Sequence, residues 1–229
     1  MSRNTYVYLA GDLVFRPGAI AIFDRLRALC RAVGLEGLAP FDGQAGIETL
    51  PPGLETTLKI VAADRALMDR CAGGIFCVDP FRRAADMDPG TAVEIGYMMA
   101  QGKKLAGYTV DGRLYPEKVA SYRLTAWGDA LRQRVTHDAP VESGAIEDAD
   151  GILAHSDGMV QNGMIEGFIR MSGGFVAVHD DFYEAFRIAA EDLALLPTGW
   201  YPNDVALADG WLYAINGKSD PGPNPGNCA

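Results

Sequence analysis

Short apolar runs alternate with longer amphipathic segments along most of the chain. Compact apolar or β-branched runs are typical of strands, whereas apolar residues spaced three or four apart are typical of helices. The first pattern predicts strands at residues 6–10, 38–41, 74–78, 104–109 and 175–178. The second pattern predicts helices at residues 18–33, 52–71, 89–101, 158–171 and 180–195.

Two of these segments show the patterns most clearly. The segment 18–33 carries its apolar residues on one helical face, with Gly34 as a stop signal. The run Gly74–Val78 is apolar throughout, which suits a strand buried on both faces. Strands that alternate with helices in this way predict an α/β fold, with a five-stranded parallel sheet covered by helices on both sides.

The remaining chain is less regular. Residues 111–157 are polar and acidic, and are expected to form either a connection over the site or a long surface excursion. Beyond residue 196 the texture changes to Gly, Pro, Asn and Asp around Trp200 and Trp211. We therefore predict one domain at residues 1–196 and a partly irregular C-terminal extension at residues 197–229.

Composition and charge argue against several classes of partner. The 229 residues carry a net charge of −10, and such an acidic surface would repel the phosphates of nucleic acid, so no nucleic-acid partner is expected. No apolar run is long enough to span a bilayer, so no membrane partner is expected either. The four cysteines form no C-x-x-C pair and fit buried thiols of a cytoplasmic protein, and the three histidines are too scattered for a zinc site, so no metal is predicted.

Candidate chemistry gathers where the predicted strands end, which is where open α/β sheets bind ligands. Asp88 precedes Pro89 and reads as a helix N-cap, a structural role that leaves one oxygen for a ligand. Glu94 lies near the start of a helix that is apolar nearly all round, so its carboxylate needs a partner or a function. Asp64 has the simpler interpretation of a solvent-facing carboxylate beside Arg65.

Several blocks of the sequence resemble the nucleoside 2-deoxyribosyltransferases. They are YLAGDLVFRPGA, LCRAVGLEGLAPFD, KIVAADRALMDRCAGGIFCVDPFR, DPGTAVEIGYMMAQGKKLAGY and VQNGMIEGFI, in order over about residues 6–110 and 157–195. The resemblance implies a flavodoxin-like three-layer sandwich. It also implies exchange of nucleobases on 2′-deoxyribonucleosides, with retention at the anomeric carbon and without metal or organic cofactor, in nucleotide salvage.

The resemblance also implies roles for individual residues. The nucleophile falls on Glu94, the tyrosine that orients it on Tyr8, and the proton donor to the base on Asp64. Substrate-binding positions fall on Asp88, Asn162, Met164, Gly11 and Phe15. Asn162 is expected to reach the site of a neighbouring subunit and to bind the 5′-hydroxyl end of the substrate there, which implies a homo-oligomer. The expected partners are 2′-deoxyribonucleosides and free nucleobases.

Three features depart from the family pattern: Asp12 replaces a proline, Arg83 replaces a glycine, and the tail after residue 196 is long. Two alternatives remain open at this point. One is an N-glycoside hydrolase of deoxynucleosides or their 5′-monophosphates, although Asp12 would repel a phosphate. The other is a non-catalytic, flavodoxin-like nucleotide-binding module, in which Glu94 would be dispensable.

Overall fold

A computed structural model describes residues 5–134, 145–156 and 158–195 of the chain. Its centre is a five-stranded parallel sheet in the order β2-β1-β3-β4-β8. The strands are β1 (Thr5–Ala10), β2 (Leu35–Leu38), β3 (Gly73–Cys77), β4 (Lys104–Thr109) and β8 (Val176–Val178). The prediction of an α/β fold with five parallel strands is confirmed.

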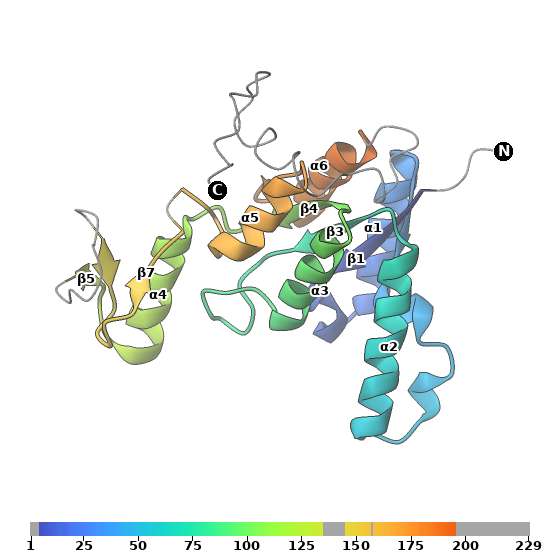
Figure 1. Cartoon of the computed structure of the whole chain (residues 1–229), viewed down its shortest axis with the longest axis horizontal. Coiled ribbons are helices and arrows are strands. Elements are labelled where there is room, and N and C mark those ends of the chain that lie inside the picture. The colour runs from blue at the N-terminus through green and yellow to red at the C-terminus, as the bar shows by residue number, and fades with distance from the viewer. Residues whose placement is uncertain (1–4, 135–144, 157, 196–229) are drawn as a thin grey trace, which may run out of the picture.

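Helices cover both faces of the sheet (Figure 1). One face packs on α1 (Ala19–Ala32) and α6 (Phe182–Ala194), around a core that includes Phe23, Leu26 and Phe186. The other face packs on α2 (Leu54–Arg70), α3 (Pro89–Ala100) and α5 (Gly163–Met171), around a core that includes Phe76, Ile95 and Met98. These three layers agree with the flavodoxin-like sandwich that the family resemblance implies.

Strand β2 and helix α5 have other bounds than the sequence predicts. The strand spans 35–38 rather than 38–41, because Gly34 adopts φ 81° and the chain pairs with β1 immediately after it. Pro40 instead opens the short 3-10 helix η2 (Pro40–Gly43), and a second one, η3 (Ile47–Thr49), follows. Helix α5 begins only after Asn162, whose side chain caps it, and not at residue 158.

The middle segment contains structure that the apolar pattern did not reveal. Helix α4 (Tyr115–Trp127) is followed by β5 (Arg132–Gln133), β6 (Ile146–Glu147) and β7 (Leu153–Ala154), which form a small antiparallel sheet. Helix α4 and this small sheet lie to one side of the main sheet in Figure 1. Helix α4 buries only Tyr115 and Lys118, so it has no apolar stripe that a periodicity analysis could detect.

The predicted domain boundary at residue 196 and the extension 197–229 lie outside the described residues. Among the helices that the structure does describe, none is both long and apolar enough to cross a membrane. The carboxyl ends of β1, β3 and β4 lie at one edge of the sheet. Gly11 and Asp12 directly follow β1, Asp79 follows β3, and Asp88 stands immediately before α3.

Candidate active site

Tyr8 and Glu94 meet across the layer between β1 and α3. The Tyr8 hydroxyl donates a hydrogen bond of 2.7 Å to Oε1 of Glu94. Tyr8 is fully buried because β1 is central and its side chain points to the face covered by α2 and α3. Glu94 is partly buried, in the second turn of α3. The contact fixes one carboxylate oxygen and leaves Oε2 for another partner.

The surroundings of Glu94 favour its protonated form. Burial is the largest cause, and together with the charges of Asp64 and Asp88 it raises the pKa of Glu94 from 4.5 to about 8. The hydrogen bond from Tyr8 opposes this shift, because it stabilises the carboxylate. Burial and the nearby carboxylates also raise the pKa of Tyr8, so the phenol keeps its proton and remains a donor. A perturbed carboxyl beside a fixed donor is typical of a catalytic group.

Asp64 lies on α2, near enough to Glu94 for its charge to act on that group. It is partly buried rather than solvent-facing, so the simpler interpretation of this residue is wrong. Nε2 of Gln44 donates a hydrogen bond of 3.0 Å to its Oδ1. Burial raises the pKa of Asp64, and the Gln44 contact lowers it. Gln44, which directly follows η2, is a site residue that sequence reasoning missed, and no motif marks it.

Asp88 has the capping role that the sequence predicts. Its Oδ2 accepts hydrogen bonds from the backbone N–H of Thr91 at 2.9 Å and from the Thr91 hydroxyl at 3.0 Å. Pro89 occupies the first position of α3. The Asp88 side chain is buried and its charge acts on both Glu94 and Asp12. It is therefore placed at the edge of the sheet, close to the candidate nucleophile.

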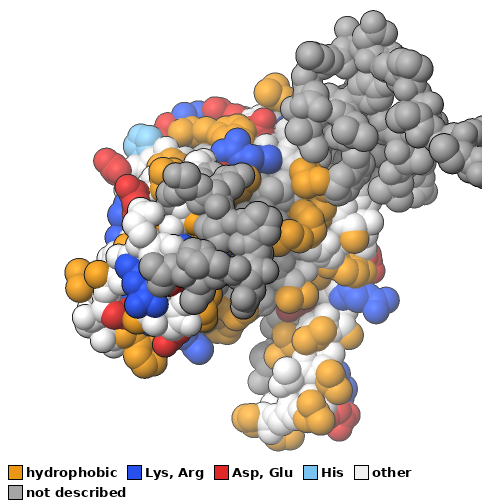
Figure 2. Space-filling model, turned by 60° about the vertical axis from the view of Figure 1, so that its left-hand side comes forward, with side chains coloured by type: hydrophobic (Ala, Val, Ile, Leu, Met, Phe, Trp, Pro, Cys, Tyr) orange, Lys and Arg blue, Asp and Glu red, His pale blue; other side chains and the backbone are white. Residues whose placement is uncertain are grey.

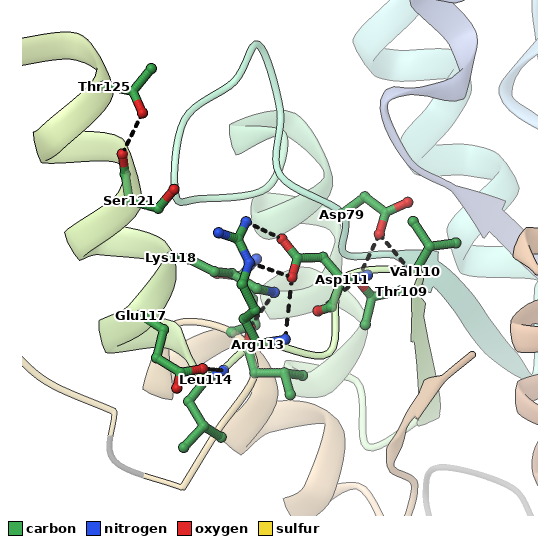
Figure 3. A network of polar contacts seen from close by, with 12 residues as sticks. Asp79, Thr109, Val110, Asp111, Arg113, Leu114, Glu117, Lys118, Ser121 and Thr125 are labelled. Atoms are coloured by element: carbon green, nitrogen blue, oxygen red, sulfur yellow. Dashed lines mark hydrogen bonds and ion pairs between the residues drawn. The ribbon is translucent and has the colours of Figure 1, made fainter. Parts of the chain in front are cut away.

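Asp79 joins the ends of two strands, as Figure 3 shows. Its Oδ1 accepts the Thr109 hydroxyl at 2.6 Å and the Val110 N–H at 2.8 Å. The Cys77 thiol donates to its other oxygen at 3.6 Å. With these contacts Asp79 holds β3 and β4 in register at their carboxyl ends, which is a structural role.

Two aromatic side chains lie in contact on the segments that follow β1 and β3. Phe15, at the end of the 3-10 helix η1 (Asp12–Phe15), is 65 % exposed, and its ring centroid lies 5.9 Å from that of Phe81. The Arg82 guanidinium lies over the Phe81 ring, 4.6 Å from its centroid. Arg82 and Arg83 have φ values of 51° and 63°, a region that costs energy for residues other than glycine. Such strain is often found in ligand-binding loops.

Gly11 permits the close approach of β1 to β3. Its φ is 151°, and a Cβ at this position would lie 2.5 Å from Cβ of Cys77. Asn162 and Met164 lie at the start of α5, where Oδ1 of Asn162 accepts the Met164 N–H at 3.0 Å. The Met164 side chain is 63 % exposed.

Thus Tyr8, Asp64 and Glu94 form one cluster. The Asn162 oxygen instead caps its own helix and makes no hydrogen bond to these three side chains.

Comparison with known proteins places this architecture in a family. A sequence profile of the family described as nucleoside 2-deoxyribosyltransferase matches residues 7–164, more than half of the chain. The chain belongs to the nucleoside 2-deoxyribosyltransferase family. The match includes Tyr8, Asp64, Asp88, Glu94, Asn162 and Met164.

Individual proteins are also similar to this family member. An uncharacterized protein of Schizosaccharomyces pombe is 66 % identical over 188 residues, which cover 82 % of this chain and 88 % of that protein. The structure of a 2-desoxiribosyltransferase from Leishmania mexicana aligns with a TM-score of 0.52 and 24 % identity, covering 82 % of this chain and 97 % of the other. The latter similarity shows the shared fold.

A 2-deoxyribosyltransferase from Bacillus psychrosaccharolyticus is more distant, with a TM-score of 0.41 and 17 % identity over 52 % of this chain and 82 % of the other. Within residues 5–134, 145–156 and 158–195 of the present family member, no group of three or more His, Cys, Asp or Glu side chains is arranged to hold a metal ion.

Proposed function

We propose that the protein exchanges the nucleobase of 2′-deoxyribonucleosides through a covalent deoxyribosyl ester of Glu94. The observation that carries the proposal is the hydrogen bond of 2.7 Å from Tyr8 to Oε1 of Glu94, within a member of this family. The bond fixes the carboxylate and leaves Oε2 to attack C1′ of the sugar. A carboxylate held in this way is suited to retaining glycosyl transfer.

In the first half-reaction the ionised form of Glu94 reacts. The bond from its Oε2 to C1′ forms while the bond from C1′ to the base nitrogen breaks. The electron pair of the broken bond goes to the departing base, which takes up one proton. Asp64 is the proposed donor, because burial raises its pKa and it lies close enough to Glu94 for the two groups to interact. In the second half-reaction an incoming base attacks C1′, loses its proton to Asp64, and releases Glu94. This order gives ping-pong kinetics.

The remaining residues have proposed binding roles. Asp88 would hold a sugar hydroxyl with the carboxylate oxygen that does not cap α3, while Phe15 would pack against the base near Phe81. Gly11 would let the sugar approach the end of β1, where a side chain would collide with Cys77. Deoxyribose suits the mechanism, because the absent 2′-hydroxyl makes the cationic transition state easier to form.

A base-exchange assay tests the proposal. The purified protein is incubated with 2′-deoxyinosine and adenine, or with thymidine and adenine, and the products are separated by chromatography. Deoxyadenosine from the first pair alone indicates a purine-restricted transferase, and from both pairs a broad one. Free base without a new nucleoside supports the hydrolase alternative. No reaction, together with a Glu94→Ala variant that retains all measured ligand binding, supports the non-catalytic binding module.

We further propose that the active species is a homo-oligomer in which Asn162 serves a neighbouring site. Support comes from the exposed Met164 side chain beside Asn162 and from apolar residues on an exposed face of α2. Leu54, Leu58 and Val61 on that helix are 78 %, 57 % and 58 % exposed. Figure 2 shows apolar side chains at the projecting lower end of the molecule, where α2 begins.

Subunit mixing tests this arrangement. Glu94→Ala and Asn162→Ala variants are each expected to be inactive alone. If Asn162 acts in a neighbouring site, mixed oligomers contain some sites with both residues intact, so activity returns. A monomer with full activity in sedimentation experiments would contradict the arrangement.

A further inference from the structure

One carboxylate oxygen at the edge of the sheet is buried without a partner. Oδ2 of Asp12 accepts two hydrogen bonds from Arg16, at 3.0 Å from Nε and 2.9 Å from Nη2. Oδ1 of the same carboxylate is buried, and none of the described residues donates a hydrogen bond to it. The whole Asp12 side chain is only 12 % exposed. A buried carboxylate oxygen without a donor is costly, which points to a ligand that supplies one.

Asp12 lies at the same edge of the sheet as the proposed sugar-binding residues. It follows Gly11 directly at the end of β1, the strand that carries Tyr8. The charge of Asp88 acts on Asp12 and also on Glu94, so the three carboxyl groups lie along the same edge. Asp12 also begins η1, the short helix that ends at the exposed Phe15. Its position is therefore close to groups that we assign to the sugar and to the base.

We propose that Asp12 is a specificity-determining residue, which makes the site select nucleosides with a free 5′-hydroxyl over their 5′-monophosphates. This inference rests on the proposed function. A 5′-hydroxyl is uncharged, so the Asp12 carboxylate does not repel it. A 5′-phosphate brings a charge of about −1.5 to −2 at neutral pH, and would meet the Asp12 carboxylate instead.

Asp12 also holds the guanidinium of Arg16, which lies four residues further along the same segment. Both hydrogen bonds from Arg16 go to Oδ2, so the guanidinium is held by the carboxylate and partly neutralised. Without Asp12, Arg16 would be free to bind a phosphate. Arg82 and Arg83 on the loop after β3 are exposed and provide other positive charges near Phe81. The test must therefore separate Arg16 from these loop residues.

The experiment compares kcat/KM for 2′-deoxyinosine and its 5′-monophosphate, with adenine as acceptor. Wild type is expected to prefer the nucleoside. Asp12→Ser should lower that preference about tenfold or more, because it removes the repulsion and releases Arg16. In Asp12→Ser with Arg16→Gln, the preference should recover part of this loss. Asp24→Ser is the matched control, because Asp24 pairs with Arg27 on the exposed face of α1.

Three results would overturn the proposal. They are equal use of both substrates by wild type, an unchanged preference in Asp12→Ser, and an equal change in Asp24→Ser. If Asp12→Ser does not fold, Asp12→Asn removes the charge with little change in shape and is expected to lower the preference in the same direction. An unchanged preference in that variant also overturns the proposal, since Oδ1 then serves only the internal packing.

The outcome for Asp12 can be distinguished from failure of the proposed function. If wild type turns over neither substrate, calorimetric titration with 2′-deoxyinosine and with its 5′-monophosphate replaces the assay. Tighter binding of the nucleoside to wild type, with a smaller difference in Asp12→Asn, supports the role of Asp12. The same difference in both proteins, or no difference in wild type, overturns it.

Discussion

Glu94→Gln is expected to stabilise the folded protein at alkaline pH and to have little effect near pH 5. In the folded state burial raises the pKa of Glu94 to about 8, whereas its ordinary value is 4.5. Between these pH values the unfolded chain binds fewer protons at this position than the folded protein. The free energy of unfolding of wild type therefore falls as the pH rises from 4.5 to 8, and levels off above 8. Glutamine has no proton to lose and avoids this penalty.

The magnitude follows from the two pKa values. Their difference corresponds to roughly 4–5 kcal/mol of unfolding free energy if it is fully realised. Glu94 retains some contact with solvent, which screens part of this penalty, so we expect a stabilisation of about 2–3 kcal/mol at pH 9. The amide oxygen of glutamine can still accept the Tyr8 hydroxyl, so the contact at 2.7 Å is not lost with the charge.

Urea unfolding followed by tryptophan fluorescence at pH 5, 7 and 9 measures the effect. Groups remote from Glu94 titrate alike in both proteins, so the difference between variant and wild type reports on Glu94 and the carboxyl groups coupled to it. Glu55→Gln is the control, because the Glu55 side chain is 86 % exposed and pairs only with Lys59 one helical turn away. A difference that does not change between pH 5 and pH 9 would refute the reasoning. So would an equal pH-dependent gain in Glu55→Gln.

Three further predictions concern the groups around Glu94. Tyr8→Phe removes a donor that stabilises the Glu94 carboxylate, so the pKa of Glu94 should rise above about 8 and kcat/KM at pH 7 should fall about tenfold or more. The increase of kcat/KM with pH should move to higher pH than in wild type, and an unshifted pH profile would contradict this. Asp88→Ala removes the cap of α3 and should cost about 1 kcal/mol in urea unfolding, whereas Asp88→Asn should cost less; equal costs would contradict the capping role. Gln44→Ala removes the hydrogen bond that lowers the pKa of Asp64, so release of the base should continue to higher pH than in wild type. A pH profile of single-turnover rates measures this, and an identical profile would exclude an effect of Gln44 on the proton donor.

Much of the fold could be predicted from local patterns. The five strands and the helices between them follow from apolar runs and stripes, because burial on a sheet face or a helix face imposes a fixed spacing. The prediction was wrong where local signals compete or are weak. Pro40 stands inside the expected second strand and opens a 3-10 helix instead. Helix α4 has no apolar stripe, because it buries little more than Tyr115 and Lys118.

Some features of the candidate site could likewise be predicted from local patterns, and others could not. Spacing alone indicated that Asp88 caps a helix and that Glu94 lies on an apolar helix near its start, and the structure shows both features. The motifs that resemble the family supplied Tyr8, Asp64 and Asn162, whose catalytic and binding roles stay predictions. Spacing favoured a solvent-facing Asp64, and the packing of α2 against its neighbours decided otherwise.

The sequence by itself determined the succession of strands and helices, the parallel sheet, and the edge at which chemistry would gather. These properties depend on neighbours within a few residues, so periodicity and capping signals reveal them. Only the tertiary structure decided which polar atoms meet. The contact of Tyr8 with Glu94 spans 86 positions, that of Gln44 with Asp64 spans 20, and Oδ1 of Asp12 has no donor among the residues that the structure describes. Such pairings depend on how the layers pack, because periodicity assigns a side chain to a face but does not say which distant atom lies opposite.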